Sequence, residues 1–430
     1  MWGCKMNELN FQQEVGRLCL QIITPVNIAD GTKLTAKDYF YDSKKQKAYF
    51  LNLHKWHQFI YQHGLLEAYE KYVSNAEDKR NLLTWLQVKK FTLADVKDII
   101  ASEAQATVNL VNVEEKSTLN DVDKHIHQID GSLYVPGSSI KGVFRNAILY
   151  ALLKKKPDIK SQYWEKVSLE IKRLDLLDRE LNKLNQEKRN TDRDDKRRLD
   201  EINKRIKEVK KNKNKISNRI TYTANEIETI LLNALSLDSQ NNSNAINCSL
   251  RGLQVSDTLS SENMQVAILQ KVDAGFDKFG KASTHPLPIF RECMLPGAKL
   301  IFEVKLDKAM MATIGINSIA ALLNVTQNYF DAVMNLLRDA FGKQYPEQFS
   351  GIENANMFLG SNTGFLSKTI LALLAPDAQA AKEVIKILLD KSFKQHKHFM
   401  RDKVISPRTL KCTNYNGKMV LMGLTEVRRI

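Results

Sequence analysis

The spacing of apolar residues changes several times along the chain, and the changes predict a protein that mixes strands and helices. A compact apolar run over residues 15–23 is typical of a strand. Apolar residues spaced by three and four then predict helices over 55–73 and 77–104. Two further runs, 106–113 and 126–135, have the pattern of strands. A long helical stretch between strands is therefore expected in the first third of the chain.

After Pro136 and Gly137 the spacing is helical again, and Ser138 or Ser139 stands where a helix cap is expected. The apolar face of this helix carries Ile140, Val143, Phe144, Ala147, Ile148 and Ala151. Later strands are predicted over 250–256, 265–272, 289–295 and 299–306, and helices over 224–235, 318–341, 365–374 and 378–392. The chain ends in a predicted hairpin of strands, 409–413 and 419–427, around Asn416-Gly417.

Heptads of apolar residues run from 164 to 220 in two arms, separated at 185–198 by a segment without any apolar side chain. This pattern predicts an antiparallel helical hairpin with its tip in the polar segment, and a single long helix is the alternative. Each arm of about twenty residues would extend roughly 30 Å. The predicted division of the chain is 1–160 for the first part of a core, with a helical insertion at about 55–104, 161–222 for the hairpin and 223–430 for the second part of the core.

The order of predicted elements points to one fold class. A strand near residue 15, a helix near 140, strands near 250 and 299, a helix near 325 and a last strand at 410–419 follow the βαββαβ order. We therefore expect an α+β protein with a ferredoxin-like (RRM-like) core that is interrupted by large helical insertions, including the heptad-patterned hairpin.

Charge and cysteine content narrow the class of function. The chain has 64 Lys and Arg against 49 Asp and Glu, a net charge of +15 that favours a polyanionic partner. Residues 151–220 hold 23 Lys and Arg against 13 Asp and Glu, so +10 of the excess lies on the hairpin region, where a solvated coiled coil also explains it. Five scattered cysteines without a CxxC pair argue against a disulfide framework and a zinc site. No apolar run is long enough to span a bilayer and no signal-peptide pattern is present, so a cytoplasmic protein is expected.

The segment LYVPGSSIKGVFR, residues 133–145, joins the end of a predicted strand to a rigid turn and a helix start. Free N–H groups and the dipole at a helix start attract anions. Lys141 and Arg145 are four residues apart and share a helix face, so they are placed to hold two phosphates of a nucleic-acid backbone. A capped helix with two solvated cations is the alternative. Val143 and Phe144 stand where a P-loop needs Lys and Ser or Thr, so nucleotide hydrolysis is not supported.

The stretch YVPGSSIKGVFRNAI resembles the signature of the RAMP superfamily of CRISPR proteins, a glycine-containing turn and helix on a ferredoxin-like fold that cradles guide RNA. Further segments are similar, in order, to the fifth subunit of the type III-A Csm complex: LQIITPVNIADGTKLTAKDYFYD, LRGLQVSDTL, FRECMLPGAKLIFEV, FLGSNTGFLSKTI and HKHFMRDKVISPRTLKCT. The resemblance covers most of the chain outside the heptads.

This resemblance implies a set of RNA-binding residues and a role. The implied residues are Gly137, Ser138, Ser139, Lys141, Gly142, Arg145, Gly360, Gly364 and Lys368. For the last three, in LGSNTGFLSK, a plain loop and helix cap is the alternative. The chain would be a noncatalytic subunit that caps the 3′ end of the guide RNA (crRNA) and is needed for crRNA 3′ maturation and antiviral defence.

The resemblance also implies partners. They are the crRNA, the RAMP backbone subunit and the small helical subunit of the Csm complex, target RNA nearby, and cellular 3′ exonucleases. No cofactor, metal ion or membrane partner is expected. Asn27 and Ala29 stand where the family tends to show His and Gly, so no histidine role is carried over to that place. The RNP1 pattern of base-stacking domains is absent, which favours recognition of the RNA backbone.

Histidines and one aspartate are the residues to weigh for catalysis. His125 with His127, and His396 with His398, would each share one face of a strand, but neither pair has a carboxylate beside it in sequence. Solvated or RNA-facing imidazoles are therefore predicted. Asp257 is a lone carboxylate at a strand end, usually a cap or turn acceptor, although acidic residues of related RAMP backbone subunits cleave RNA.

Two other functions stay open. A metal-independent CRISPR RNA-processing endonuclease of ferredoxin-like fold would use a histidine and a nearby lysine as acid and electrophile. A protein scaffold would act mainly through the heptad hairpin.

Overall fold

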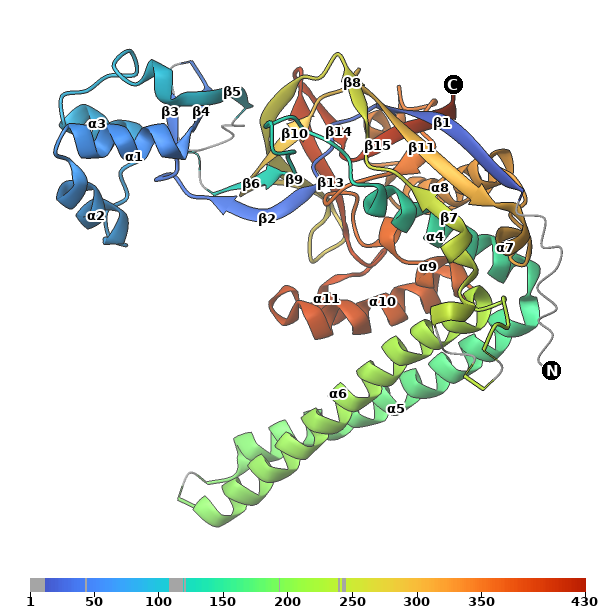
Figure 1. Cartoon of the computed structure of the whole chain (residues 1–430). Coiled ribbons are helices and arrows are strands. Elements are labelled where there is room, and N and C mark those ends of the chain that lie inside the picture. Colours follow the sequence, from blue (N-terminus) through green and yellow to red (C-terminus); the bar gives the residue numbers. More distant parts are fainter. Residues whose placement is uncertain are drawn as a thin grey trace, which may run out of the picture.

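The computed structural model describes residues 12–42, 45–107, 119, 121–192, 194–238, 240–241 and 245–430. Two sheets lie side by side in this part of the chain, helices cover the first of them, and a long helical hairpin projects away from both (Figure 1). The mixed α and β architecture agrees with the fold class expected from the sequence.

The first sheet has the strand order β12–β15–β1–β11–β7, and β8 pairs with β11. Its strands are β1 (Gln13–Ile22), β7 (Leu253–Val255), β8 (Ser260–Glu262), β11 (Lys299–Asp307), β12 (Met357–Phe358) and β15 (Leu424–Arg429). β1 is antiparallel to both β11 and β15, and β11 is antiparallel to β7. With α4 (Gly137–Lys155) between β1 and β7, and α8 (Ile319–Phe341) between β11 and β15, the elements follow the predicted strand, helix, strand, strand, helix, strand order. The last core strand is β15, however, and the predicted strand at 410–419 belongs to the second sheet.

One face of the first sheet is buried because its apolar residues alternate. In β11, Leu300, Phe302, Val304 and Leu306 all point into the main hydrophobic cluster, where apolar residues of β1, α4 and α8 meet them. The opposite face is polar, and Arg17 of β1 lies directly across from Glu303 of β11 and pairs with it at 3.2 Å. The helices therefore cover a single face of this sheet.

The second sheet has nine strands in the order β2–β6–β10–β9–β5–β4–β3, with β13 pairing with β9 and β14 with β13. They are β2 (Ala29–Leu34), β3 (Tyr39–Asp42), β4 (Lys47–Leu51), β5 (Ile100–Thr107), β6 (Val122–His125), β9 (Val266–Phe276), β10 (Ala282–Met294), β13 (Thr409–Tyr415) and β14 (Lys418–Leu421). The sequence predicted β9, β10 and β13, but not that they would form a sheet of their own.

The region at about 55–104 is not the all-helical insertion that the sequence predicts. It holds three short helices, α1 (Leu53–Gln62), α2 (Leu66–Ser74) and α3 (Leu82–Val88), packed with β3 to β5 in a lobe of its own (Figure 1). The predicted helix over 77–104 is wrong beyond α3, because Lys90 adopts a positive φ of 66° and the Asp95 carboxylate accepts the N–H of Thr92. The predicted strand over 106–113 is described only at its first two residues, which end β5.

Four other predicted elements are shorter or divided. The strand expected over 250–256 is reduced to β7, because residues 249–252 form the 3₁₀ turn η3. The strand expected over 126–135 is wrong, since β6 ends at His125 and only an isolated bridge joins His127 to Leu133. The helix expected over 365–374 is a 3₁₀ turn, η5 (Leu366–Lys368), and a short α9 (Leu371–Leu374), divided by extended Thr369. The strand expected over 419–427 divides at Gly423, which has a φ of +80°.

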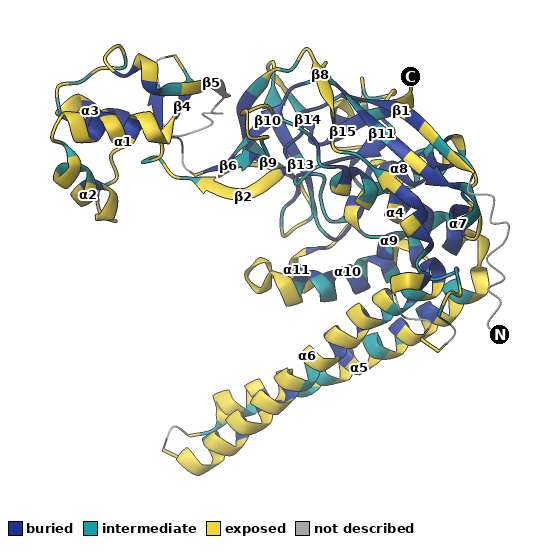
Figure 2. Cartoon of the chain, in the orientation of Figure 1, coloured by how far each residue is buried: buried dark blue, intermediate teal, exposed yellow. Residues whose placement is uncertain are grey.

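The helical hairpin is confirmed. α5 (Pro157–Asn190) and α6 (Lys196–Leu232) pack against each other, and α5 ends and α6 begins inside the predicted polar tip, so a single long helix is excluded. The helix predicted over 224–235 is the end of α6. At the base of the hairpin, Tyr163, Val167 and Ile220 belong to the main core, whereas Leu184, Ile202, Ile206 and Val209 make a small cluster near the tip. Figure 2 shows these buried residues along the seam and exposed residues on the outer surface.

The remaining helices are short, apart from α10, which spans the predicted range. They are α7 (Lys308–Ala312), α10 (Ala378–Ser392), α11 (His398–Arg401), η1 (Lys97–Ile99), η2 (Ala245–Asn247), η3 (Ser249–Gly252), η4 (Pro346–Phe349) and η6 (Lys394–His396). No helix in the described ranges has the length and apolar character that a membrane crossing requires. Cys19, Cys248, Cys293 and Cys412 are free thiols, while Cys4 lies outside the described residues. The division at 160 and 222 stays a prediction.

Candidate nucleic-acid interface

The helix start predicted to attract phosphate is already occupied by a carboxylate of the protein. α4 begins with Pro136 at the cap position, and neither Ser138 nor Ser139 caps it as expected, because both lie inside its first turn. Instead, the Gly137 N–H donates to Asp257 Oδ1 at 2.7 Å. A carboxylate at a helix start is a favourable charge arrangement, so Asp257 serves as the anion there. This geometry matches the cap interpretation of Asp257 rather than a cleavage role.

The two glycines of this segment have different surroundings. A Cβ on Gly137 would lie 2.2 Å from the carbonyl oxygen of Val255 and 2.6 Å from that of Ser256, so any side chain would separate α4 from the segment after β7. Gly142 has no atom within 4 Å of its notional Cβ and lies on the exposed face of α4. Gly137 is therefore needed for packing, and Gly142 leaves a flat, open helix surface.

Lys141 and Arg145 share a stripe of α4 as predicted, but each already has a protein partner. The Lys141 ammonium donates to the carbonyl oxygen of Leu253 at 2.6 Å, and its partial burial lowers the pKa of Lys141. Arg145 forms an ion pair with Glu228 of α6, which ties α4 to the base of the hairpin. Ser138 and Gly142 are exposed on the same side. Of the two cations, Arg145 is the more accessible, with 48% of its side chain exposed.

The later glycine loop is fastened to the segment around Asn27. A Cβ on Gly360, which has a φ of +96°, would lie 2.4 Å from the Asn27 carbonyl oxygen. Ser361 donates its N–H to that oxygen at 2.8 Å, and its hydroxyl bonds Asn27 Oδ1 at 2.6 Å. Asn27, which is buried, donates in turn to the Glu292 carbonyl oxygen at 2.8 Å. Gly360 thus permits a close contact within the protein, in agreement with the plain-loop alternative for this residue.

The structure brings the two predicted segments together at Arg145 and Lys368. Both side chains line one cavity of about 210 Å³ between α4, the base of the hairpin and the η5–α9 segment. Burial of its ammonium and the nearby Arg291 guanidinium lower the pKa of Lys368. Its ammonium donates a long hydrogen bond of 3.4 Å to the Ser361 carbonyl oxygen. Gly364 lies at the start of this segment with its notional Cβ 3.7 Å from Lys411. Two cations from distant motifs therefore converge at one opening.

Further cations, which the sequence reading missed, lie on neighbouring strands of the second sheet. Lys271 of β9 and Lys411 of β13 share the Asp273 carboxylate at 3.4 and 3.1 Å, and Arg291 of β10 pairs with Asp123 at 3.0 Å. Burial and the neighbouring Lys411 lower the pKa of Lys271 even though Asp273 is close. These residues are far apart in sequence, and each is the only Lys or Arg of its strand. They come together because the strands pair in a register that places Lys411 opposite Asp273.

His125 and His398 are more buried than predicted, and each pair has a carboxylate close to it. Glu292, which is distant in sequence, lies beside the first pair, and Asp402, four residues after His398, lies beside the second. His125 is fully buried, and its backbone N–H donates to Glu292 Oε2 at 3.0 Å. The Nε2 atom of His127 lies 3.5 Å from Glu292 Oε1. Burial lowers the pKa of His125 to about 4. The prediction of solvated imidazoles is therefore wrong for His125.

The second pair is divided by the fold. His396 is exposed, but His398 is buried and its Nδ1 lies 2.8 Å from Asp402, which also accepts from Ser406 and Arg408. Burial opposes ionisation of Asp402, but these hydrogen bonds outweigh it and lower the pKa of that carboxyl. Within the described ranges, no three His, Cys, Asp or Glu side chains gather as metal ligands would.

A family model described as the RAMP superfamily matches residues 19–352, and the chain belongs to that superfamily. Within it, the likeness is to the Csm5 proteins of type III-A CRISPR systems, as the sequence segments predicted. The protein named CRISPR system Cms protein Csm5 of Streptococcus thermophilus is 27% identical over 137 residues, 31% of this chain and 37% of that protein. The protein of the same name in Enterococcus italicus is 22% identical over 150 residues, which are 32% of this chain and 43% of that protein.

These two matches span less than half the length of the relatives. A longer match is the protein of the same name in Mycobacterium tuberculosis, 22% identical over 422 residues, 95% of this chain and 96% of the relative. Among solved structures, a chain of a Csm–crRNA–target RNA ternary complex of a type III-A CRISPR-Cas system is similar with a TM-score of 0.64 and 16% identity, covering 96% of this chain and 100% of that one. The crystal structure of T. onnurineus Csm5 is similar with a TM-score of 0.55 and 16% identity, and the match covers 95% of this chain and 99% of that one. Both share the fold.

The two glycines of α4 give a matched pair of substitutions. Gly137→Ala is expected to destabilise the protein, since its Cβ would meet two backbone carbonyls that cannot move apart cheaply. Gly142→Ala, in open space on the same helix, is expected to stabilise it by up to about 1 kcal/mol, the usual gain of Ala over Gly inside a helix. Denaturant unfolding of both variants measures the difference. Equal effects would contradict the close contact at Gly137.

Burial of His125 predicts a pH dependence of stability. Its folded pKa of about 4 is below the unfolded value of about 6.5, so between these values only the unfolded chain takes up the proton. The stabilisation is complete above pH 6.5 and is lost as the pH falls towards 4, by on the order of 3 kcal/mol. His125→Asn should remove this part of the acid sensitivity in unfolding measurements across that range, and His57→Asn, at an exposed site, should leave it. Identical slopes for wild type and His125→Asn would contradict the prediction.

Proposed function

We propose that the chain is a noncatalytic, crRNA-binding subunit of a type III-A Csm complex in the cytoplasm. The observation that carries the proposal is the whole-length likeness to a chain of a complex that contains crRNA and target RNA. The named Csm5 relatives support it independently. In this role the subunit caps the 3′ end of the crRNA, contacts the RAMP backbone subunit and the small helical subunit, and lies near target RNA.

The surface chemistry supports recognition of the RNA backbone rather than of the bases. Arg145 and Lys368 line one cavity beside the exposed Ser138 and Gly142, where a phosphate chain can approach the flat helix surface. The central strands β1, β7, β11 and β15 contain a single aromatic residue, Phe302, and it points into the core. Bases therefore have no aromatic platform on this sheet, and binding should depend strongly on salt and little on sequence.

The residue environments give little support to the alternative of a CRISPR RNA endonuclease. His398 is buried and its partner Asp402 is committed to three hydrogen bonds, while His127, whose ring lies 3.5 Å from Glu292, has only 19% of its side chain exposed. Asp257 holds the start of α4. We therefore assign the 3′ maturation of the crRNA to cellular 3′ exonucleases that this subunit recruits or limits.

Membership of the complex has a direct test. The tagged chain, isolated under native conditions from cells with the intact locus, is expected to bring crRNA and RAMP-type subunits with it. Cells that lack the chain should accumulate crRNA with unmatured 3′ ends. Purified chain that cuts repeat RNA at one position would instead establish the endonuclease alternative, and isolation of the chain without RNA would overturn the proposal.

The contact at Arg145 and Lys368 has a separate test. Replacing both by Ala should weaken binding of unrelated single-stranded RNA sequences alike and reduce the salt slope by about 1.4, or 0.7 for each lost phosphate contact. The control, Lys154→Ala with Lys156→Ala, removes two exposed cations at the other end of α4. Anisotropy titrations over a range of salt concentrations measure both.

Glu228 provides a variant of opposite sign. Because Glu228 competes with phosphate for Arg145, Glu228→Gln should tighten RNA binding. Glu226→Gln, which makes the same charge change two residues away on α6, should have a smaller effect. If neither the double variant nor Glu228→Gln changes affinity, Arg145 and Lys368 do not contact RNA.

A further inference from the structure

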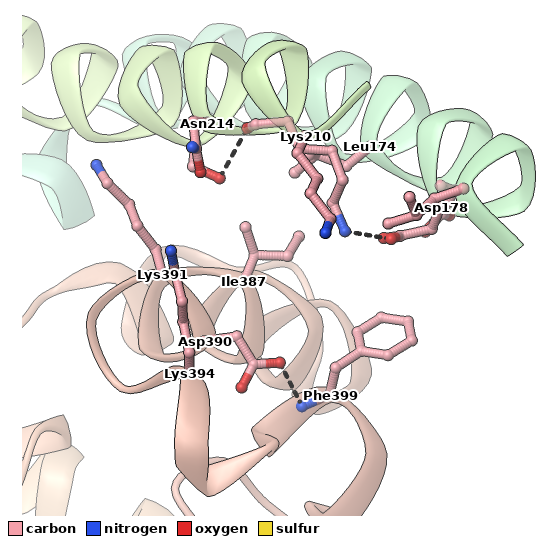
Figure 3. Close-up of a pocket in the computed structure, with 13 residues that line it drawn as sticks. Leu174, Asp178, Lys210, Asn214, Ile387, Asp390, Lys391, Lys394 and Phe399 are labelled. Atoms are coloured by element: carbon pink, nitrogen blue, oxygen red, sulfur yellow. Dashed lines mark hydrogen bonds and ion pairs between the residues drawn. The ribbon is translucent and has the colours of Figure 1, made fainter. Parts of the chain in front are cut away.

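A second cleft, of about 530 Å³, separates the helical hairpin from the C-terminal helices. One wall is formed by α5 and α6, and the other by α10, η6 and the start of α11 (Figure 3). None of the predicted RNA-binding residues lines it. The cleft is therefore distinct from the cavity at Arg145 and Lys368.

Both walls present lysines. Lys210 comes from α6, and Lys391 and Lys394 come from the opposite wall, where Figure 3 shows their amino groups directed towards the hairpin. In the part of the chain that the structure describes, none of these three exposed ammonium groups has an ion pair or hydrogen bond. The fourth lysine, Lys213, differs because it pairs with Asp178. Unpaired cations thus face the same space from two sides.

Four lysines and three aspartates line the cleft, so its lining carries a net charge of +1. Asp178 is taken by Lys213, and Asp390 accepts the backbone N–H groups of His398 at 2.6 Å and Phe399 at 2.9 Å, which fixes the start of α11. Asp175 is the remaining carboxylate. Like charges on facing walls repel each other, and a polyanion between them would relieve that repulsion.

An aromatic ring lies in the same cleft. Phe399 is 47% exposed, although a phenylalanine is ordinarily buried, and its ring lines the cleft opposite the hairpin (Figure 3). The Lys386 ammonium lies 5.6 Å from the centre of this ring. Lysines together with an accessible aromatic face are the combination that binds single-stranded nucleic acid, because phosphates meet the cations and a base stacks on the ring.

The two cavities are arranged along one face of α6. Asn214 and Ser217 line the cleft, and Asn225 and Glu228 line the cavity at Arg145. The second pair follows the first by eleven residues, which is about three helical turns or roughly 16 Å. Both openings therefore lie on the same side of α6. One RNA strand can therefore follow the hairpin from the first cavity to the second.

We propose that this cleft is a second binding site for single-stranded RNA, with phosphates held by Lys210, Lys391 and Lys394 and a base stacked on Phe399. The inference rests on the proposed function in taking RNA as the ligand. It adds that the hairpin is a wall of an RNA channel. An acidic protein segment is the competing occupant, and competition with polyglutamate distinguishes it from RNA.

The test compares two triple variants of the full-length protein. Lys210→Ala with Lys391→Ala and Lys394→Ala should reduce the salt slope for a long single-stranded RNA by about 2, or 0.7 for each of three phosphates. The control is Lys204→Ala with Lys211→Ala and Lys215→Ala, exposed cations of α6 that do not line the cleft. Equal slopes for the two triple variants on long RNA would overturn the proposal.

Phe399 provides an independent readout. Phe399→Leu should weaken binding of the long RNA by roughly fivefold or more, and Phe399→Trp should retain it. Long RNA with photoreactive uridines should crosslink to the peptide that contains Phe399. The proposal is overturned if no crosslink forms there, or if polyglutamate displaces the RNA from the cleft as well as competing RNA does, because the site would then be one for acidic protein.

The outcomes also separate this inference from the proposed function. If Arg145→Ala with Lys368→Ala weakens binding and the cleft variants do not, the subunit role stands and the cleft proposal fails. If the cleft variants weaken binding and the Arg145 and Lys368 variant does not, the cleft is an RNA site and the first interface is not.

Discussion

The contact between Gly137 and Asp257 determines where α4 begins, and the arrangement of the molecule depends on it. The N–H of Gly137 reaches the carboxylate at 2.7 Å only because no side chain separates the helix from the carbonyls of Val255 and Ser256. From this point α4 buries Ile140 and Phe144 beneath the first sheet and leads through Lys156 directly into α5. One hydrogen bond at a place without a Cβ thus orients the core helix, its exposed stripe and the base of the hairpin.

Elements with strong local periodicity were predictable from the sequence, and those that depend on distant partners were not. α8, α10 and the α5–α6 hairpin each carry a complete apolar face within their own residues. The sequence predicts one helix over 77–104 because Leu82, Leu86, Val96 and Ile99 are spaced as on a single helix. In the structure these residues lie in α3 and in the segment around η1, and all four face one shared core.

The candidate site divides in the same way. That Lys141 and Arg145 share a helix face follows from a spacing of four. Their partners could not be predicted, since Leu253 and Glu228 are distant in sequence and are brought near by β7 and α6. The sequence also could not predict that Asp257, 120 residues away, accepts the N–H at the start of α4. Its position at a strand end suggested only that it caps or accepts in a turn. Local spacing predicts which side chains are neighbours on one helix, and tertiary structure decides whether they are free.

The net charge of +15 acquires a different meaning once pairing is considered. Cations such as Arg145, Lys213 and Lys411 each have a carboxylate partner, so their charge holds elements together. Where α6 faces α10, by contrast, Lys210, Lys391 and Lys394 line a cleft without such partners in the described residues. The total charge therefore says less about a polyanionic partner than the places where cations remain unpaired.

The hairpin has a main-core cluster at its base and a closed cluster near its tip, with heptads between them. The base and the tip of the hairpin therefore each have their own apolar cluster, and the segment between them is a repeat of heptads. Removing one heptad from each arm would shorten the projection by about 10 Å and leave the packing at both ends in register. The length of the hairpin is thus modular and can change independently of the core.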